Sequence, residues 1–168
     1  MLPMNESIII SNSTPIILLH KIGQLDLLQK LYGKIYIADA VYKEVIIDGA
    51  NMAGQDFIKQ NKWIEIINIE DINAKKMFIT SLHDGEVETI ILAMEMNADL
   101  CVLDDLLARK HAKNFGLQIT GTLGILIEAK NKSYVKEVKP ILEKLKEIGM
   151  YIDSELYSTI LLNANEIS

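Results

Sequence analysis

Acidic side chains stand near both ends of one stretch, residues 83–109. Glu86 falls in the first turn of a predicted helix, and Asp104 with Asp105 directly follows a short apolar run at residues 100–103. A short continuous apolar run is typical of a parallel strand that is buried on both faces. Because ligands bind outside the carboxyl ends of such strands, this arrangement predicts half of an acidic, metal-binding active site.

The helix that carries Glu86 has one apolar face, formed at i, i+3, i+4 and i+7 spacing by Val87, Ile90, Ile91 and Met94. At about 100° per residue, Glu86 lies on the border of that face, whereas Glu88 and Glu95 point away from it. We therefore expect Glu86, and not Glu88, to reach a cleft. Asp84 is expected to cap the first turn.

Asp104 and Asp105 have an alternative role, because one of them could cap the next helix, which carries the single arginine, Arg109. Two more polar groups follow the predicted first strand, residues 7–11. Asn12 stands at its carboxyl end, and Ser13 or Thr14 is expected to cap a helix whose first turn holds a proline.

A second strand, residues 34–38, leads into a helix that Asp39 is expected to cap. Val41 and Val45 face inward on that helix, and Glu44 lies on the same side as Val41. Glu44 is therefore a further candidate, the alternative being an exposed charge without a role.

Five predicted strands alternate with helices, at residues 7–11, 34–38, 63–67, 100–103 and 117–120. This order predicts an α/β fold with a parallel sheet and helices on both faces. No repeat or linker divides the 168 residues, so we expect one domain, residues 1–168, with the helices after residue 134 packed on it.

The fold brings the candidates together, because Asn12, Asp104 and Asp105 each end a strand and Glu44 and Glu86 overhang the same edge. Like charges at close range repel unless a cation neutralises them, and oxygen ligands suit Mg²⁺ or Mn²⁺. We therefore expect a site for one of these cations.

The composition argues against several classes of protein, namely nucleic-acid-coating, membrane-spanning and secreted disulfide-bonded proteins. The net charge of −6 argues against a surface that coats nucleic acid nonspecifically. No apolar run is long enough to span a membrane, the start of the chain does not resemble a signal peptide, and one cysteine, Cys101, allows no internal disulfide. We expect a cytoplasmic protein.

Four segments together resemble the PIN domain, and in particular PIN-like proteins related to VapC toxins: NSTPI (12–16), GEVETIILA (85–93), DDLLAR (104–109) and GTLGIL (121–126). The resemblance implies a three-layer α/β/α fold and a metal-dependent endoribonuclease, often the toxin of a toxin-antitoxin pair. It implies an RNA substrate, an antitoxin partner and a homodimer. The C-terminal helices are candidates for the dimer interface or for antitoxin binding.

The resemblance places the family's acids at Asn12, Glu44, Glu86 and Asp104, with Asp105 beside the last. It further implies that Ser13 supports the site and that Arg109 either contacts phosphate or pairs with an acid such as Asp105; we favour the pairing. The two histidines nearest this stretch, His83 and His111, lack the spacing of a zinc site and are expected to be solvated.

Asn12 departs from the pattern, because an amide offers a neutral oxygen where the family usually has a carboxylate. The chain is therefore either a working nuclease or a catalytically weakened PIN-like module that binds nucleic acid or protein. An aspartyl-phosphate phosphatase would need an aspartate at position 12, and no glycine-rich nucleotide-binding motif is present. We expect the exchange of Glu86 or Asp104 for its amide to leave the metal-free melting temperature unchanged or raised.

Overall fold

The computed structural model describes residues 6–49, 54–78 and 82–167. At its centre is a five-stranded sheet in the order β3-β2-β1-β4-β5, in which every neighbouring pair is parallel. The strands are β1 (Ile9–Ser11), β2 (Ile35–Ala38), β3 (Ile64–Ile67), β4 (Leu100–Val102) and β5 (Ile119–Thr120). The predicted parallel α/β fold is confirmed.

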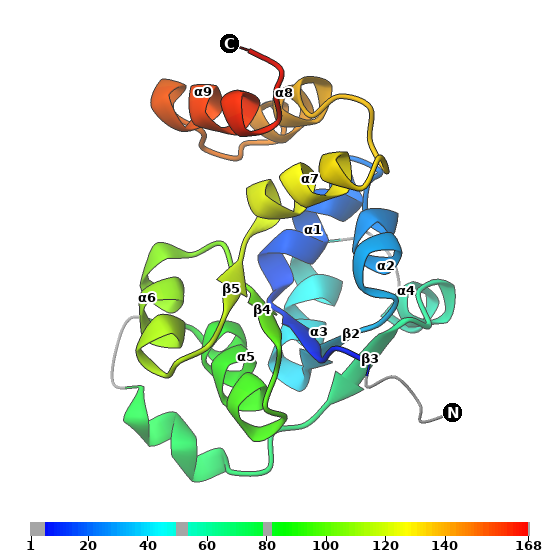
Figure 1. The fold of residues 1–168 in the computed structure, drawn as a ribbon. Helices are drawn as coiled ribbons and strands as arrows, with labels where there is room; N and C mark the ends of the chain where they lie inside the picture. Colours follow the sequence, from blue (N-terminus) through cyan, green and yellow to red (C-terminus); the bar gives the residue numbers. More distant parts are fainter. Residues whose placement is uncertain (1–5, 50–53, 79–81, 168) are drawn as a thin grey trace, which may run out of the picture.

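Helices lie on both sides of this sheet (Figure 1): α1 (Ser13–Lys21), α2 (Asp26–Tyr32), α3 (Asp39–Glu44), α4 (Gly54–Gln60), α5 (Asp84–Glu95), α6 (Leu106–Asn114) and α7 (Thr122–Asn131). A π-helical turn, η1 (Val45–Gly49), extends α3, and a 3-10 segment, η2 (Ile72–Met77), precedes α5. Helix α5 packs against β1, β2 and β4 with α6 beside it, while α1, α2 and α7 pack together. The result is a three-layer α/β/α architecture.

The sheet is apolar on both faces, which explains the continuous apolar runs. Ile9 and Ile10 are neighbours in β1 and point to opposite faces, yet both are buried, as are Cys101 and Val102 in β4. The hydrophobic effect therefore fixes the central strands between two helical layers.

Several helix caps differ from the prediction. Asp105 does cap α6, as one of the two alternatives for the Asp104–Asp105 pair predicted, and Asp71 caps η2; each accepts a backbone N–H three residues on. The predicted caps Asp39 and Asp84, however, are the first residues of α3 and α5, and the extended capping conformation belongs to the residue before each. Similarly, Ser13 is the first residue of α1, so the prediction that Ser13 or Thr14 caps it is wrong.

Two further helices, α8 (Lys139–Glu147) and α9 (Ser154–Asn163), lie beyond α7 and away from the sheet (Figure 1). Glu166 ties them to α7, because its carboxylate lies 2.9 Å from Lys130 Nζ and accepts the backbone N–H groups of Val138 and Lys139. These three bonds lower the pKa of Glu166 despite the opposing effect of burial. No helix in the described ranges is long and apolar enough to span a membrane.

Candidate active site

The centre of the sheet is the point where the strand order reverses. After β1 the chain adds β2 and β3 on one side, and it then returns to add β4 and β5 on the other. Ser11 pairs with Val102 across this point, and the next residue, Asn12, donates its backbone N–H to the Val102 carbonyl at 3.0 Å. Asn12 and Asp104 therefore follow two adjacent strands at the position where open α/β sheets bind ligands.

Asn12 is buried against α5. Only 1% of its surface is exposed, and its Oδ1 lies 3.4 Å from the hydroxyl of Thr89. The same hydroxyl lies 2.6 Å from the Gly85 carbonyl, which is its stronger acceptor. The Asn12 oxygen consequently keeps acceptor capacity at the edge of the sheet.

Glu44 faces the same edge from the end of α3. Its Oε2 accepts the Ser13 hydroxyl at 2.5 Å, and its Oε1 accepts the Gly85 backbone N–H at 3.1 Å. A Cβ atom on Gly85 would overlap the Glu44 carboxylate, so only glycine permits this approach. The structure thus places Ser13 where it holds Glu44 toward the start of α5.

Glu86 is the most buried carboxylate of the group, with 4% of its surface exposed. Burial raises its pKa, and the negative charges of Asp105 and Glu44 raise it further, whereas His83 lowers it. His83 Nε2 lies 3.0 Å from Glu86 Oε1, and its Nδ1 lies 3.6 Å from Glu44 Oε1. The side chains of Glu44, Glu86 and His83 therefore form one cluster.

Asp104 is held by the start of α7. Thr122 donates its backbone N–H to Oδ1 at 2.7 Å and its hydroxyl to Oδ2 at 2.6 Å. Burial raises the pKa of Asp104, although the Thr122 bonds and the charge of Arg109 act in the opposite direction. Asp105 is exposed, and its Oδ1 caps α6 by accepting the Ala108 N–H at 2.8 Å.

Arg109 does not pair with Asp105 as predicted. Its Nη1 donates to the backbone carbonyl of Leu103 at 2.8 Å, and no ion pair of the described residues includes it. A Cβ atom on Gly121 would lie 2.6 Å from Asp104 Oδ1 and 2.8 Å from Arg109 Nη1. Because α6 begins at the end of β4, the guanidinium reaches back to the strand and closes over this glycine together with Asp104.

A family model described as a PIN domain matches residues 8–166. The chain belongs to the PIN-domain family. The PIN domain is a nuclease-type fold, and its members generally use divalent metal ions. No curated protein matches the chain significantly.

The donor atoms of this PIN domain fit a hard divalent cation in type. Carboxylate and amide oxygens are the ligands that Mg²⁺ and Mn²⁺ take. Within the described ranges, however, no three His, Cys, Asp or Glu side chains lie close enough together to hold one ion. Glu44 and Asp104 are instead hydrogen-bonded to Ser13 and Thr122, and a bound cation would compete with these bonds.

Sequence reasoning missed three participants: His83, Thr89 and Thr122. His83 is solvated as predicted, with 63% of its side chain exposed, but it also contacts two of the acids, which the prediction did not include. The sequence did contain one signal for His83, which stands three residues before Glu86. At the start of a helix, an acidic side chain at the third position often reaches back to the N-cap residue. The hydroxyls gave no such signal for the site, since Thr122 bonds to Asp104 across 18 residues and Thr89 lies 77 residues from Asn12.

Glu88 also differs from its prediction. It was expected to point away from the buried face of α5, yet only 8% of its surface is exposed. Its carboxylate lies 3.0 Å from Lys75 Nζ and 3.4 Å from the Ala40 backbone nitrogen. It therefore joins α5 to α3 and η2 and, as predicted, is not part of the acidic cluster.

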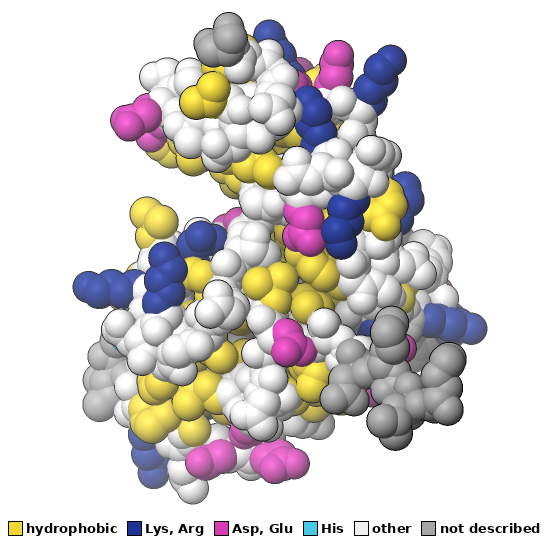
Figure 2. Space-filling model, viewed as in Figure 1, with side chains coloured by type: hydrophobic (Ala, Val, Ile, Leu, Met, Phe, Trp, Pro, Cys, Tyr) yellow, Lys and Arg dark blue, Asp and Glu magenta, His cyan; other side chains and the backbone are white. Residues whose placement is uncertain are grey.

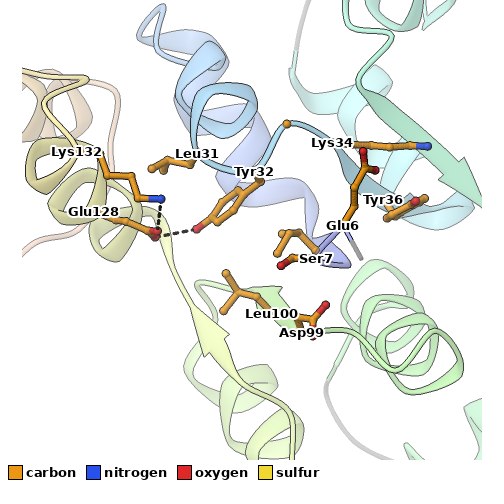
Figure 3. A pocket seen from close by; sticks show the side chains of 12 residues that line it. Glu6, Ser7, Leu31, Tyr32, Lys34, Tyr36, Asp99, Leu100, Glu128 and Lys132 are labelled. Atoms are coloured by element: carbon orange, nitrogen blue, oxygen red, sulfur yellow. Dashed lines mark hydrogen bonds and ion pairs between the residues drawn. The ribbon is translucent and has the colours of Figure 1, made fainter. Parts of the chain in front are cut away.

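A cavity of about 870 Å³ lies at the opposite, amino edge of the sheet (Figure 3). Its polar wall contains Glu128, which accepts the Tyr32 hydroxyl at 3.2 Å and lies 3.8 Å from Lys132 Nζ. Asp99, also in the wall, accepts the Ile8 backbone N–H. None of the candidate residues lines this cavity, so size alone does not locate the site.

Proposed function

We propose that this PIN domain is a Mg²⁺- or Mn²⁺-dependent endoribonuclease that hydrolyses phosphodiester bonds of RNA. The observation that carries the proposal is the position of Glu86, a buried carboxylate whose pKa is raised by burial and by two acidic neighbours at the carboxyl edge of a parallel sheet. Packing does not account for such an arrangement, since burial and repulsion between like charges both destabilise a fold. Perturbed carboxylates at a ligand-binding edge are typical of a functional site.

Glu44, Glu86 and Asp104, with Asp105 beside them, are the residues that would hold the metal. When bound, the cation would neutralise their repulsion, polarise the phosphate and lower the pKa of a water molecule. The other residues orient these ligands: Ser13 donates its hydroxyl proton to Glu44 Oε2, and Thr122 holds both oxygens of Asp104. Such supporting hydrogen bonds fix the direction of a ligand.

Asn12 favours a second candidate function, that of a weakened module that binds nucleic acid or protein without cutting it. Its amide lowers the negative charge of the site by one unit and should weaken the affinity for a divalent cation. The two candidates share the fold and differ in whether the present residues support catalysis.

Cleavage of matched RNA and DNA oligonucleotides with Mn²⁺ distinguishes them. The natural protein is compared with Glu86→Gln, with Asn12→Asp and with Glu147→Gln, an exposed acid on α8 that serves as control. If the natural protein and the control cut RNA while Glu86→Gln does not, the nuclease proposal holds. If only Asn12→Asp cuts, the chain is a binding module. If every folded variant is inactive, the nuclease proposal fails.

A toxin role, an antitoxin partner and a homodimer belong to the same proposal as its finer part, and they rest on the resemblance to VapC-related proteins. Induced expression of the natural protein should then arrest bacterial growth, and Glu86→Gln should not. If cells that express the active enzyme grow normally, the toxin role is rejected and the nuclease proposal is unaffected.

A further inference from the structure

Helix α6 presents an unusual stripe to solvent. Leu106, Lys110 and Lys113 follow i, i+4, i+7 spacing and so share one face. Leu106 is 83% exposed and both lysines are exposed, whereas Ala108 and Ala112 on the opposite face are fully buried. The apolar side chain and the two cations therefore share one solvent-exposed face of α6.

Among the described residues, the cations of this stripe have no acidic partner. Some lysines elsewhere do lie beside carboxylates, including the pairs Lys30–Asp26, Lys43–Asp39 and Lys132–Glu128. No ion pair of the described residues includes Lys110 or Lys113, and α6 itself contains no acid. In a chain with a net charge of −6, this concentration of positive charge is a local exception.

The stripe begins at the acidic edge. Asp105 is the N-cap of α6, and Lys110 and Lys113 follow at roughly 7 and 12 Å along the helix axis, at 1.5 Å per residue. Figure 2 shows Lys and Arg side chains gathered over α6, beside the hollow that separates this helix from α8 and α9. A strand lying along this face would run from the lysines toward Asp105, the residue that follows Asp104.

We propose that the exposed face of α6 is the substrate track of this PIN domain, on which Lys110 and Lys113 bind phosphates of a single-stranded nucleic acid and Leu106 contacts a sugar or base. The side chains of residues three apart on a helix are about 5–6 Å apart at Cβ, and flexible lysines adapt from there to neighbouring phosphates. The inference rests on the proposed function, because the track is useful only if the acidic residues at its end form the active site. We favour nucleic acid over an acidic protein segment as the ligand, because the lysines lie on the helix that begins at the proposed nuclease site.

The test is equilibrium binding of a fluorescently labelled single-stranded RNA, with DNA of the same sequence in parallel. EDTA is present so that no cleavage occurs. The full-length protein is compared with Lys110→Glu plus Lys113→Glu, and with Lys59→Glu plus Lys62→Glu. The control pair has the same spacing and charge change, is exposed, and lies near α4. Lys110→Gln plus Lys113→Gln provides a milder variant if the charge reversal does not fold.

We expect the α6 variant to bind at least about 10-fold more weakly than the control variant. Its slope of log affinity against log salt should fall by about 1.4, the value for two lost phosphate contacts on a single strand. Equal losses in both variants would mean that only net charge matters, and would overturn the track. Failure of the natural protein to bind, or equally tight binding of a polyglutamate peptide, would also overturn it.

The two proposals can fail separately. Binding through α6 without cleavage in Mn²⁺ would retain the track and reject the nuclease. Cleavage that is as fast in the α6 variant as in the control, at substrate concentrations below saturation, would retain the nuclease and reject the track.

Discussion

Asp104 and Thr122 join the end of β4 to the start of α7 through two short hydrogen bonds, one from the backbone N–H and one from the hydroxyl of Thr122. The N-cap of α7 is Gly121, which has no side chain, and the carboxylate of Asp104, 18 residues earlier in the chain, accepts the first N–H of the helix. Asp104 therefore has a structural role beside its proposed catalytic one.

Replacement of Asp104 by alanine should lower the stability of the metal-free protein by about 1–2 kcal/mol, because the Thr122 donors lose their acceptor. Asp104→Asn should remain within about 0.5 kcal/mol, since the amide oxygen accepts the N–H and the hydroxyl can turn to accept from the amide nitrogen. Thermal unfolding in EDTA measures both. If Asp104→Ala and the natural protein have the same melting temperature, Asp104 does not stabilise the start of α7.

Glu86→Gln should raise the melting temperature of the metal-free protein at neutral pH. The pKa of Glu86 is higher in the folded chain than its ordinary value of 4.5, so ionisation disfavours the folded state. This penalty is absent below pH 4.5 and develops as the pH rises through the folded pKa. The advantage of Glu86→Gln should therefore be larger at pH 7.5 than at pH 4.5, with about 2–4 °C for each kcal/mol relieved. An advantage that does not change with pH would contradict the assigned cause.

Asn12→Asp should destabilise the metal-free protein by roughly 2–3 kcal/mol, because it places a charge in a buried position whose side-chain neighbour is the uncharged Thr89. Mn²⁺ should reverse the loss, by about 2.7 kcal/mol at a concentration 100 times the dissociation constant. Unfolding of both proteins with and without Mn²⁺ tests this. A smaller Mn²⁺ response in Asn12→Asp than in the natural protein would argue against a metal at this edge.

Gly85→Ala should displace the Glu44 carboxylate, because the added methyl group takes its place, and nuclease activity should fall by at least about 10-fold. The double variant with Glu44→Ala gives the control. The three atoms nearest to the added methyl group all belong to the Glu44 side chain, so the double variant removes this overlap. Alanine should then stabilise α5 by about 0.5–1 kcal/mol relative to glycine. A destabilisation that persists in the double variant would mean that the methyl group disturbs another contact.

The sequence by itself determined the layers of the fold and the edge of the sheet at which the candidate residues lie. Short apolar runs between helical segments specified buried parallel strands, because a strand covered on both faces must be apolar at every position. The ends of those runs placed Asn12 and Asp104, and helical periodicity placed Glu86 on the border of its apolar face. These features depend on local periodicity and on chain order, so one sequence is enough to read them.

Only the tertiary structure decided which group meets which. The contacts of Ser13 with Glu44 and of Thr122 with Asp104 cross 31 and 18 residues, and Glu88 finds Lys75 across the gap between α5 and η2. Arg109 reaches a backbone carbonyl, an acceptor that every residue carries and that no sequence pattern marks. A hydrogen bond depends on distances of a few tenths of an ångström, which the packing of layers sets and periodicity does not encode.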